Sequence, residues 1–156
     1  MTADDPTDDA PTQGRIVAGR HLLPIRVYFE DTDHTGIVYH ANYLRYMERA
    51  RTEMLRHAGV LHAVAMAAND GFWAVHAMAI TWHNPARIDD ELLVVTTVTR
   101  VRAAANELTH KVMRGETLLC SATVTAAFLA MNGRPQRQSR IWHERFTGLM
   151  EQAIAG

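Results

Sequence analysis

Residues 25–59 read IRVYFEDTDHTGIVYHANYLRYMERARTEMLRHAG, and three patterns follow one another along this stretch. Residues 25–30 are rich in β-branched and aromatic side chains and partly alternate, which predicts a strand. Residues 31–36 are turn formers that end the strand. In residues 43–58 apolar side chains recur every three or four positions, which predicts one long helix with Gly59 as its C-terminal stop.

Most of the chain beyond this helix is typical of β-structure. The expected strands are residues 72–82, 92–101, 107–113 and 117–131, and residues 142–154 are consistent with a short amphipathic helix. One helix cannot cover both faces of five strands, so we expect an α+β domain in which one antiparallel sheet wraps around the long helix. The remaining apolar face and sheet edge would need a partner chain, which predicts a homo-oligomer, either a dimer or a tetramer.

Size, charge and cysteine content narrow the classes of function. The chain has 156 residues, of which 47% are hydrophobic and 21% charged, as in a single globular domain. Its formal net charge of -1 argues against a dedicated nucleic-acid-binding protein. A single cysteine, Cys120, cannot form an intrachain disulfide, a zinc knuckle or a Cys-x-x-Cys redox pair.

The N-terminal region differs from the rest in composition. Residues 1–20 contain several aspartates, two prolines and two glycines but no apolar run, which predicts a disordered leader before a single domain over residues 21–156. The segment lacks the pattern of a secretory signal, and no apolar run in the sequence is long enough for a membrane helix. We therefore expect a cytoplasmic protein.

The densest polar cluster is residues 30–34, with His40 a little further on, between the end of the first strand and the start of the helix. Three interpretations are open. Asp31 and Asp33 can stabilise a turn through side-chain to backbone hydrogen bonds. Two carboxylates and a histidine can also bind a metal, although this spacing matches no recognised ligand pattern. Alternatively, Asp33 can act as a base or nucleophile on a carbonyl that is polarised by backbone N–H groups at the helix start.

Residues 26–43 and 48–55 resemble the signature of the 4-hydroxybenzoyl-CoA thioesterase family, and within it they are most similar to the branch associated with the Tol-Pal envelope system. A weaker similarity continues over residues 85–92 and 133–135, whereas residues 1–20 are not covered. The resemblance implies a hotdog fold, which is a long central helix wrapped by a five-stranded antiparallel sheet.

The same resemblance implies hydrolysis of an acyl-CoA thioester without a metal or a cofactor, because coenzyme A is part of the substrate. Asp33 matches the family's catalytic carboxylate, which serves as nucleophile or as general base. His40, seven residues later, matches the position whose backbone N–H binds the developing oxyanion, and its ring is a candidate contact to water or substrate.

Further positions are candidates for substrate binding. Tyr39 and Tyr43 flank His40 and could line an acyl pocket. Arg102 matches a basic position near the third-to-fourth strand connection that contacts the coenzyme A phosphates in aromatic-acyl members, although the next family position is Ala103 here. Arg134 after the last strand is another candidate, because arginine suits bidentate phosphate contact.

Two other functions compete with hydrolysis. A catalytically weak hotdog module could bind an acyl carrier protein or a partner associated with the inner membrane or envelope. A hotdog dehydratase or hydratase would need a histidine and carboxylate pair in a different motif context, and the sequence does not contain that context.

Overall fold

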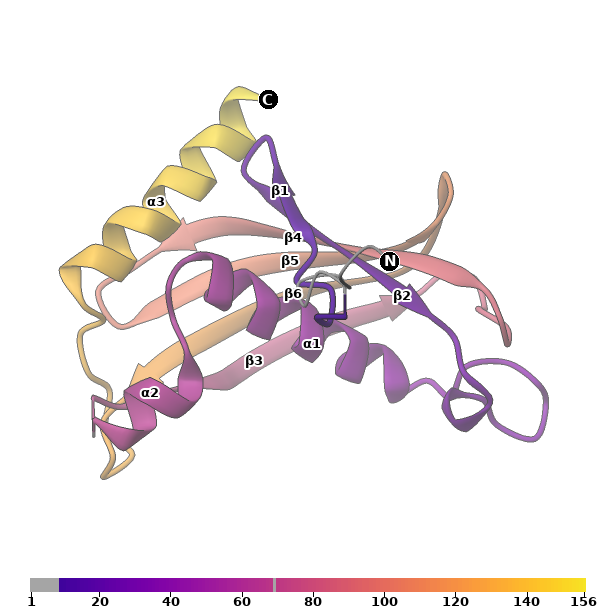
Figure 1. The fold of residues 1–156 in the computed structure, drawn as a ribbon, viewed down its shortest axis with the longest axis horizontal. Helices are drawn as coiled ribbons and strands as arrows, with labels where there is room; N and C mark the ends of the chain where they lie inside the picture. The colour runs from indigo at the N-terminus through magenta and orange to yellow at the C-terminus, as the bar shows by residue number, and fades with distance from the viewer. Residues whose placement is uncertain (1–8, 69) are drawn as a thin grey trace, which may run out of the picture.

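The structure is a computed structural model that describes residues 9–68 and 70–156. Within these residues, six antiparallel strands form one sheet in the order β1-β2-β4-β5-β6-β3 (Figure 1). The strands are β1 (Arg15–Val17), β2 (Arg20–Arg26), β3 (Phe72–Trp82), β4 (Glu91–Val101), β5 (Ala105–Arg114) and β6 (Thr117–Leu129). The helices are α1 (Asn42–His57), α2 (His62–Ala67) and α3 (Arg140–Ala155), with a short 3-10 helix, η1 (Phe29–Asp31). The α+β hotdog architecture expected from the sequence is therefore confirmed, with one more strand than expected.

The core lies between the sheet and the two long helices, which cover the same face (Figure 1). On α1, Met47, Ala50 and Met54 are buried because they repeat every three or four residues along one side. Alternate side chains of β4 from Leu92 to Val98 are buried beneath the helices, as the period of two in a half-buried strand requires. Phe146 of α3 joins the same core near the C-terminal end of α1.

The first long strand lies earlier than the sequence predicted. β2 ends at Arg26, and the expected strand over residues 25–30 is wrong because the chain turns into η1. The Asp31 carboxylate accepts a hydrogen bond from the Tyr28 N–H at 2.8 Å, and Thr32 N–H donates to the Phe29 carbonyl at 3.1 Å. These local bonds replace a sheet ladder and leave the Phe29 side chain 82% exposed, despite its high strand propensity.

Part of the expected leader is structured. β1 pairs with β2 through Arg15 opposite Leu22 and Val17 opposite Arg20, so ordered structure begins before residue 21. Gly19 permits the intervening turn, because a Cβ atom there would come within 2.3 Å of the Leu149 carbonyl oxygen on α3. This long-range contact is not visible in local composition. Residues 1–8 of the expected leader lie outside the described residues.

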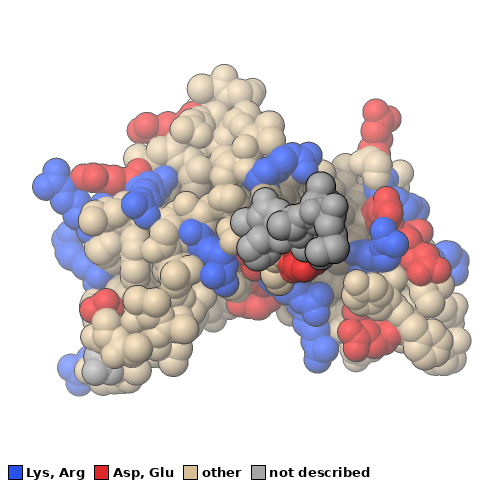
Figure 2. All heavy atoms as spheres, in the orientation of Figure 1, with Lys and Arg blue, Asp and Glu red and all other residues tan. Residues whose placement is uncertain are grey.

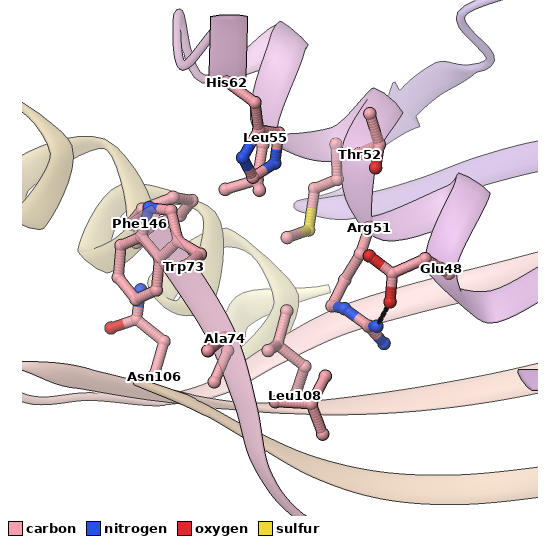
Figure 3. A pocket seen from close by; sticks show the side chains of 13 residues that line it. Glu48, Arg51, Thr52, Leu55, His62, Trp73, Ala74, Asn106, Leu108 and Phe146 are labelled. Atoms are coloured by element: carbon pink, nitrogen blue, oxygen red, sulfur yellow. Dashed lines mark hydrogen bonds and ion pairs between the residues drawn. The ribbon is translucent and has the colours of Figure 1, made fainter. Parts of the chain in front are cut away.

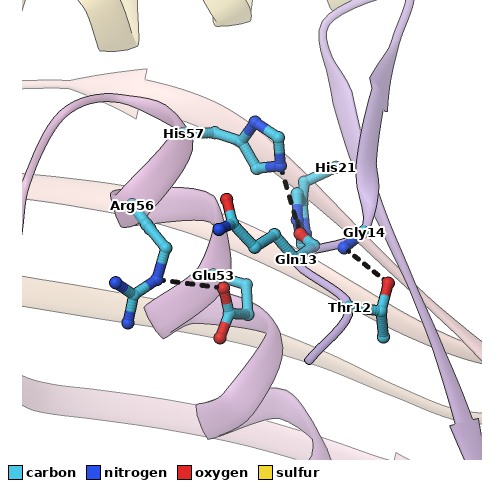
Figure 4. A network of polar contacts seen from close by, with 7 residues as sticks. All are labelled: Thr12, Gln13, Gly14, His21, Glu53, Arg56 and His57. Atoms are coloured by element: carbon cyan, nitrogen blue, oxygen red, sulfur yellow. Dashed lines mark hydrogen bonds and ion pairs between the residues drawn. The ribbon is translucent and has the colours of Figure 1, made fainter. Parts of the chain in front are cut away.

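A pair of histidines fixes the segment before β1. The Gln13 carbonyl accepts hydrogen bonds from His21 Nε2 at 2.8 Å and from His57 Nε2 at 3.1 Å (Figure 4). Both rings must therefore carry a proton on Nε2. Burial lowers the pKa of His21, so its neutral form is favoured in the folded chain.

The surface and the free edge of the sheet bear on the expected partners. On the face in Figure 2, basic and acidic side chains are interspersed and do not gather into one basic surface. Within the described residues β3 pairs with β6 on one side only, so it is an edge strand. Among the described residues, no helix is both long and apolar enough to cross a membrane.

Candidate active site

Asp33 begins a tight turn between η1 and α1. Its N–H donates to the Ile37 carbonyl at 2.9 Å, and its own carbonyl accepts from the Gly36 N–H at 3.0 Å. Gly36 has a φ of 81°, a backbone conformation that side chains disfavour, so glycine suits this corner. Bridge pairing of Thr32 with Val38 closes the base of the turn. Asp33 is thereby held at a defined place on a partly exposed loop.

Hydrogen bonds from Thr35 orient the Asp33 carboxylate. Asp33 Oδ1 accepts from the Thr35 N–H at 2.8 Å and from the Thr35 hydroxyl at 2.5 Å. The hydroxyl bond is the main cause that lowers the pKa of Asp33, and the backbone bond acts in the same direction. No hydrogen bond among the described residues uses Asp33 Oδ2. The carboxylate is therefore ionised at neutral pH with one oxygen available for chemistry.

Asp31 has a structural role in the same loop. Its carbonyl oxygen accepts from the Tyr39 N–H at 2.9 Å and from Asn42 Nδ2 at 2.7 Å, which ties the loop to the first residue of α1. Its carboxylate is occupied by the Tyr28 N–H. Asp31 and Asp33 thus both stabilise turns, as the first interpretation predicted. They do not form a metal site with His34, because no group of three suitable ligands converges within the described residues.

His40 lies just before the start of α1 rather than within its first turn. Its carbonyl accepts from Trp82 Nε1 at 3.1 Å, and its ring centroid is 4.5 Å from that of Tyr39 and 5.7 Å from that of Trp82. In the part of the chain that the structure describes, the His40 N–H has no hydrogen-bond partner. Nor does any described side chain cap the following helix at Ala41. Unpaired N–H groups at a helix start favour negative charge nearby.

A hollow beside His40 brings together residues from three segments. Its lining is Ile37, His40, Tyr43, Trp82, His83, Asn84 and Pro85. Tyr43 is one of the predicted lining residues, and its hydroxyl accepts a hydrogen bond from the Ala86 N–H at 3.0 Å. Tyr39 packs against His40 at a tilted angle but is not among the lining residues. Trp82 and its neighbours were not predicted, although the break at Asn84–Pro85 marks where β3 ends.

The predicted arginines lie at the opposite end of the sheet in the same chain. Arg102 follows β4 and donates to Glu107 Oε1 at 2.6 Å, whereas Arg134 follows β6 and is exposed. Asp33 and His40 are near the start of β4 and the end of β3. β3 has 11 residues and so spans about 35 Å. One chain therefore does not bring these arginines and Asp33 into one site.

A second cavity, of about 100 Å³, lies between α1, α2 and β3 (Figure 3). Most of its lining is apolar, including Leu55, Trp73 and Phe146. Glu48 and Arg51, which pair with each other, form one wall. The sequence did not single out these two residues. However, Arg51 shares the four-residue spacing of Met47 and Leu55, which was the available signal.

Cys120 is not a candidate nucleophile. It is fully buried in β6. Burial raises the pKa of the Cys120 thiol to about 12, so the reactive thiolate is scarce at neutral pH.

Comparison with known proteins identifies relatives over most of the chain. The profile of the thioesterase-like superfamily matches residues 27–149. Acyl-CoA thioester hydrolase YbgC of Escherichia coli is 44% identical over 102 residues, which are 65% of this chain and 75% of the relative. Acyl-CoA thioesterase YbgC of Haemophilus influenzae is 40% identical over 105 residues, 67% of this chain and 77% of the relative. A probable thioesterase from Bartonella henselae, with 35% identity and a TM-score of 0.74, covers 77% of this chain and 99% of its own.

Proposed function

The chain belongs to the thioesterase-like superfamily and is an acyl-CoA thioester hydrolase, and from this premise we propose that Asp33 and the start of α1 form its reacting centre. The observation that carries the proposal is the Asp33 carboxylate, which is ionised, oriented by Thr35 and, among the described residues, left with Oδ2 free of hydrogen bonds. The only cysteine is buried in its thiol form, so an aspartate is the better candidate for this chemistry.

Two routes use the free Asp33 oxygen. In the first, Asp33 Oδ2 attacks the thioester carbonyl carbon, the C–S bond breaks, coenzyme A leaves as a thiolate, and water hydrolyses the resulting mixed anhydride. In the second, Asp33 takes a proton from a water molecule, whose oxygen attacks the same carbon. A single turnover in H₂¹⁸O tests the first route. Recovery of ¹⁸O in Asp33 identifies the nucleophilic route with attack of water on the Asp33 carbonyl carbon of the anhydride, because the general-base route puts ¹⁸O only into the acid product.

The oxyanion that forms on the carbonyl needs a hydrogen-bond donor. The His40 N–H is proposed for this role because it lacks a partner among the described residues and adjoins an uncapped helix start. A preorganised N–H stabilises negative charge as it develops, with little reorganisation. The role belongs to the backbone, so a His40→Ala variant should keep more activity than an Asp33→Ala variant.

A second copy of the chain is proposed to complete the site. The free edge of β3 carries exposed side chains such as Val75 and Trp82, as expected of an edge that pairs with another strand. Antiparallel pairing of two β3 strands would set the start of one strand near the end of the other. The 100 Å³ cavity of one copy would then face the reacting centre of the other and take the acyl group.

The same pairing of two β3 strands would bring the predicted arginines close to a reacting centre. Arg102 and Arg134 lie at the cavity end of their own chain, and therefore near the reacting centre of the second copy. They are proposed to contact the coenzyme A phosphates there, since arginine binds phosphate bidentately.

The central test compares Asp33→Asn with wild type on a panel of acyl-CoA substrates, read by release of free thiol. We expect Asp33→Asn to lose turnover while its circular dichroism stays unchanged. Asp89→Asn is the matched control, because Asp89 is exposed and its φ of 66° suits asparagine. Undiminished turnover in Asp33→Asn would refute the role of Asp33. Failure of wild type to cleave any substrate, together with tight binding of an acyl carrier protein, would favour the non-catalytic binding module.

A further inference from the structure

Arg51 brings a buried positive charge to the wall of a mostly apolar cavity. The residue is 6% exposed and lines the space between α1, α2 and β3 (Figure 3). Opposite it stand the aromatic rings of Trp73 and Phe146. Burying a guanidinium group is costly unless its charge and its N–H donors are satisfied. The hydrogen bonds that Arg51 makes, and those it lacks, therefore indicate which chemical groups the cavity can bind.

The partners of Arg51 use only part of its hydrogen-bonding capacity. Its Nη2 pairs with Glu48 Oε2, and its Nη1 lies 3.3 Å from His110 Nε2. A guanidinium group has five N–H donors. Among the described residues no further hydrogen bond of Arg51 is found, so donors remain on a side chain that borders the cavity.

His110 holds Arg51 without neutralising it. His110 is fully buried, and its Nδ1 lies 2.9 Å from the Thr96 hydroxyl. Because Arg51 is always a donor, His110 Nε2 accepts and its proton lies on Nδ1. Burial and the adjacent Arg51 charge lower the pKa of His110 to about 3, so the ring is neutral at physiological pH. Glu48 at the cavity wall, with its side chain 62% exposed, is therefore the counter-charge within hydrogen-bond reach.

We propose that Arg51 determines acyl specificity by donating a hydrogen bond to an oxygen atom on the acyl group that enters this cavity. The inference rests on the proposed function, in which the cavity takes the acyl group. A cavity of about 100 Å³ is smaller than the roughly 150 Å³ that accommodates benzene. The favoured substrates are therefore short acyl groups that carry a hydroxyl or carbonyl oxygen, rather than hydrocarbon chains of the same size.

The preference for an oxygen-bearing acyl group follows from the Arg51 N–H donors that a hydrocarbon chain would leave without hydrogen bonds. An apolar acyl group would fill the cavity but displace water from the remaining N–H donors of Arg51 without replacing its hydrogen bonds. An oxygen acceptor would satisfy one of them. A hydrogen bond to a charged group in a desolvated site changes affinity by about 10- to 100-fold.

Isosteric substrate pairs test this directly. 3-Hydroxybutanoyl-CoA and 3-methylbutanoyl-CoA differ only by a hydroxyl in place of a methyl group, and 4-hydroxybutanoyl-CoA and pentanoyl-CoA make the same comparison one carbon deeper. In wild type we expect kcat/KM to favour the hydroxylated member of at least one pair by about tenfold or more. In Arg51→Met the ratio should fall towards one. A purely structural role for Arg51 would lower the rates for both members and leave their ratio unchanged.

Controls separate this inference from the proposed function. Arg49→Met makes the same substitution at an exposed position of α1 and should retain the wild-type ratio. If Arg51→Met does not fold, Arg51→Lys keeps a charge beside Glu48 but loses the planar fork of donors, and it should also lose the preference. Hydrolysis without preference for either hydroxylated substrate in wild type overturns the inference and leaves the hydrolase intact. Absence of hydrolysis of every substrate overturns the proposed function instead.

Discussion

Replacement of His110 by glutamine should remove a defined part of the pH dependence of stability. Burial keeps the folded-state pKa of His110 at about 3, against about 6.5 in the unfolded chain. Because the folded pKa is depressed, the unfolded state binds the proton first. The stability that the neutral ring provides is complete above pH 6.5 and is lost as the pH falls towards 3. Between pH 7 and pH 5 the linkage relation gives a loss of about 1.9 kcal/mol.

The magnitude is robust because any folded pKa below about 4 gives nearly the same loss over this pH interval. The neighbouring His21 also has a lowered pKa, as do Asp33 and Asp90, and these groups add acid sensitivity to both proteins. The difference between wild type and His110→Gln therefore isolates His110. Glutamine retains a carbonyl oxygen that can accept from Arg51.

The assay is urea unfolding at pH 5, 6 and 7 with one protein concentration throughout, since the proposed pair of chains would unfold in a concentration-dependent way. The free energy of unfolding of wild type should fall by about 2 kcal/mol more than that of His110→Gln from pH 7 to pH 5. His143→Gln, an exposed histidine on α3, is the control and should follow wild type. Parallel pH dependence in wild type and His110→Gln would refute the buried neutral state of the ring.

Two further outcomes test the site and the core. In Thr35→Val the Asp33 carboxylate loses the hydroxyl bond that lowers its pKa, so the acid limb of the kcat/KM profile should move to higher pH. Thr35→Ser keeps the hydroxyl and should retain the wild-type profile. An unmoved limb in Thr35→Val contradicts the assignment of that limb to Asp33. Phe146→Ala deletes the ring of a residue that is 1% exposed and should lower the free energy of unfolding by about 3–5 kcal/mol in urea titrations. The control Ile141→Ala, on the exposed side of α3, should change it by about 0.5 kcal/mol or less. A loss in Phe146→Ala as small as that of the control would contradict the packing of Phe146 in the core.

The sequence predicts well those elements whose buried residues recur at a regular spacing along the chain. Met47, Ala50 and Met54 repeat at helical spacing, and α1 begins and ends within one residue of its predicted bounds. The first strand was misplaced because Phe29 has strand propensity, but the Asp31 carboxylate closes a turn there. β1 was missed because it depends on the close approach of Gly19 to α3, a contact between residues far apart in the chain.

The candidate site likewise has a part that local sequence predicts and a part that depends on long-range contacts. The turn that orients Asp33 is local, since Thr35 and Gly36 supply its hydrogen bonds within three residues. The arginine assignments, in contrast, depend on which end of the sheet each loop occupies and on whether a second chain is present. The role of Arg51 depends on both local spacing and long-range packing. Its helical spacing with Met47 and Leu55 marks an inward position, but only the packed cavity reveals that Arg51 has more N–H donors than the acceptors around it can satisfy.

Three features of the single chain have one explanation in the proposed pairing of two β3 strands. β3 is an edge strand with exposed apolar side chains, the cavity opens at its start, and the Asp33 loop lies near its end. A strand of about 35 Å separates the last two, far more than a short acyl group can bridge. Antiparallel pairing brings the start of one strand to the end of the other, and it does so twice because the contact is two-fold symmetric. Hydrolysis should therefore be a property of the pair, with each copy providing the carboxylate for one thioester and the cavity for the other.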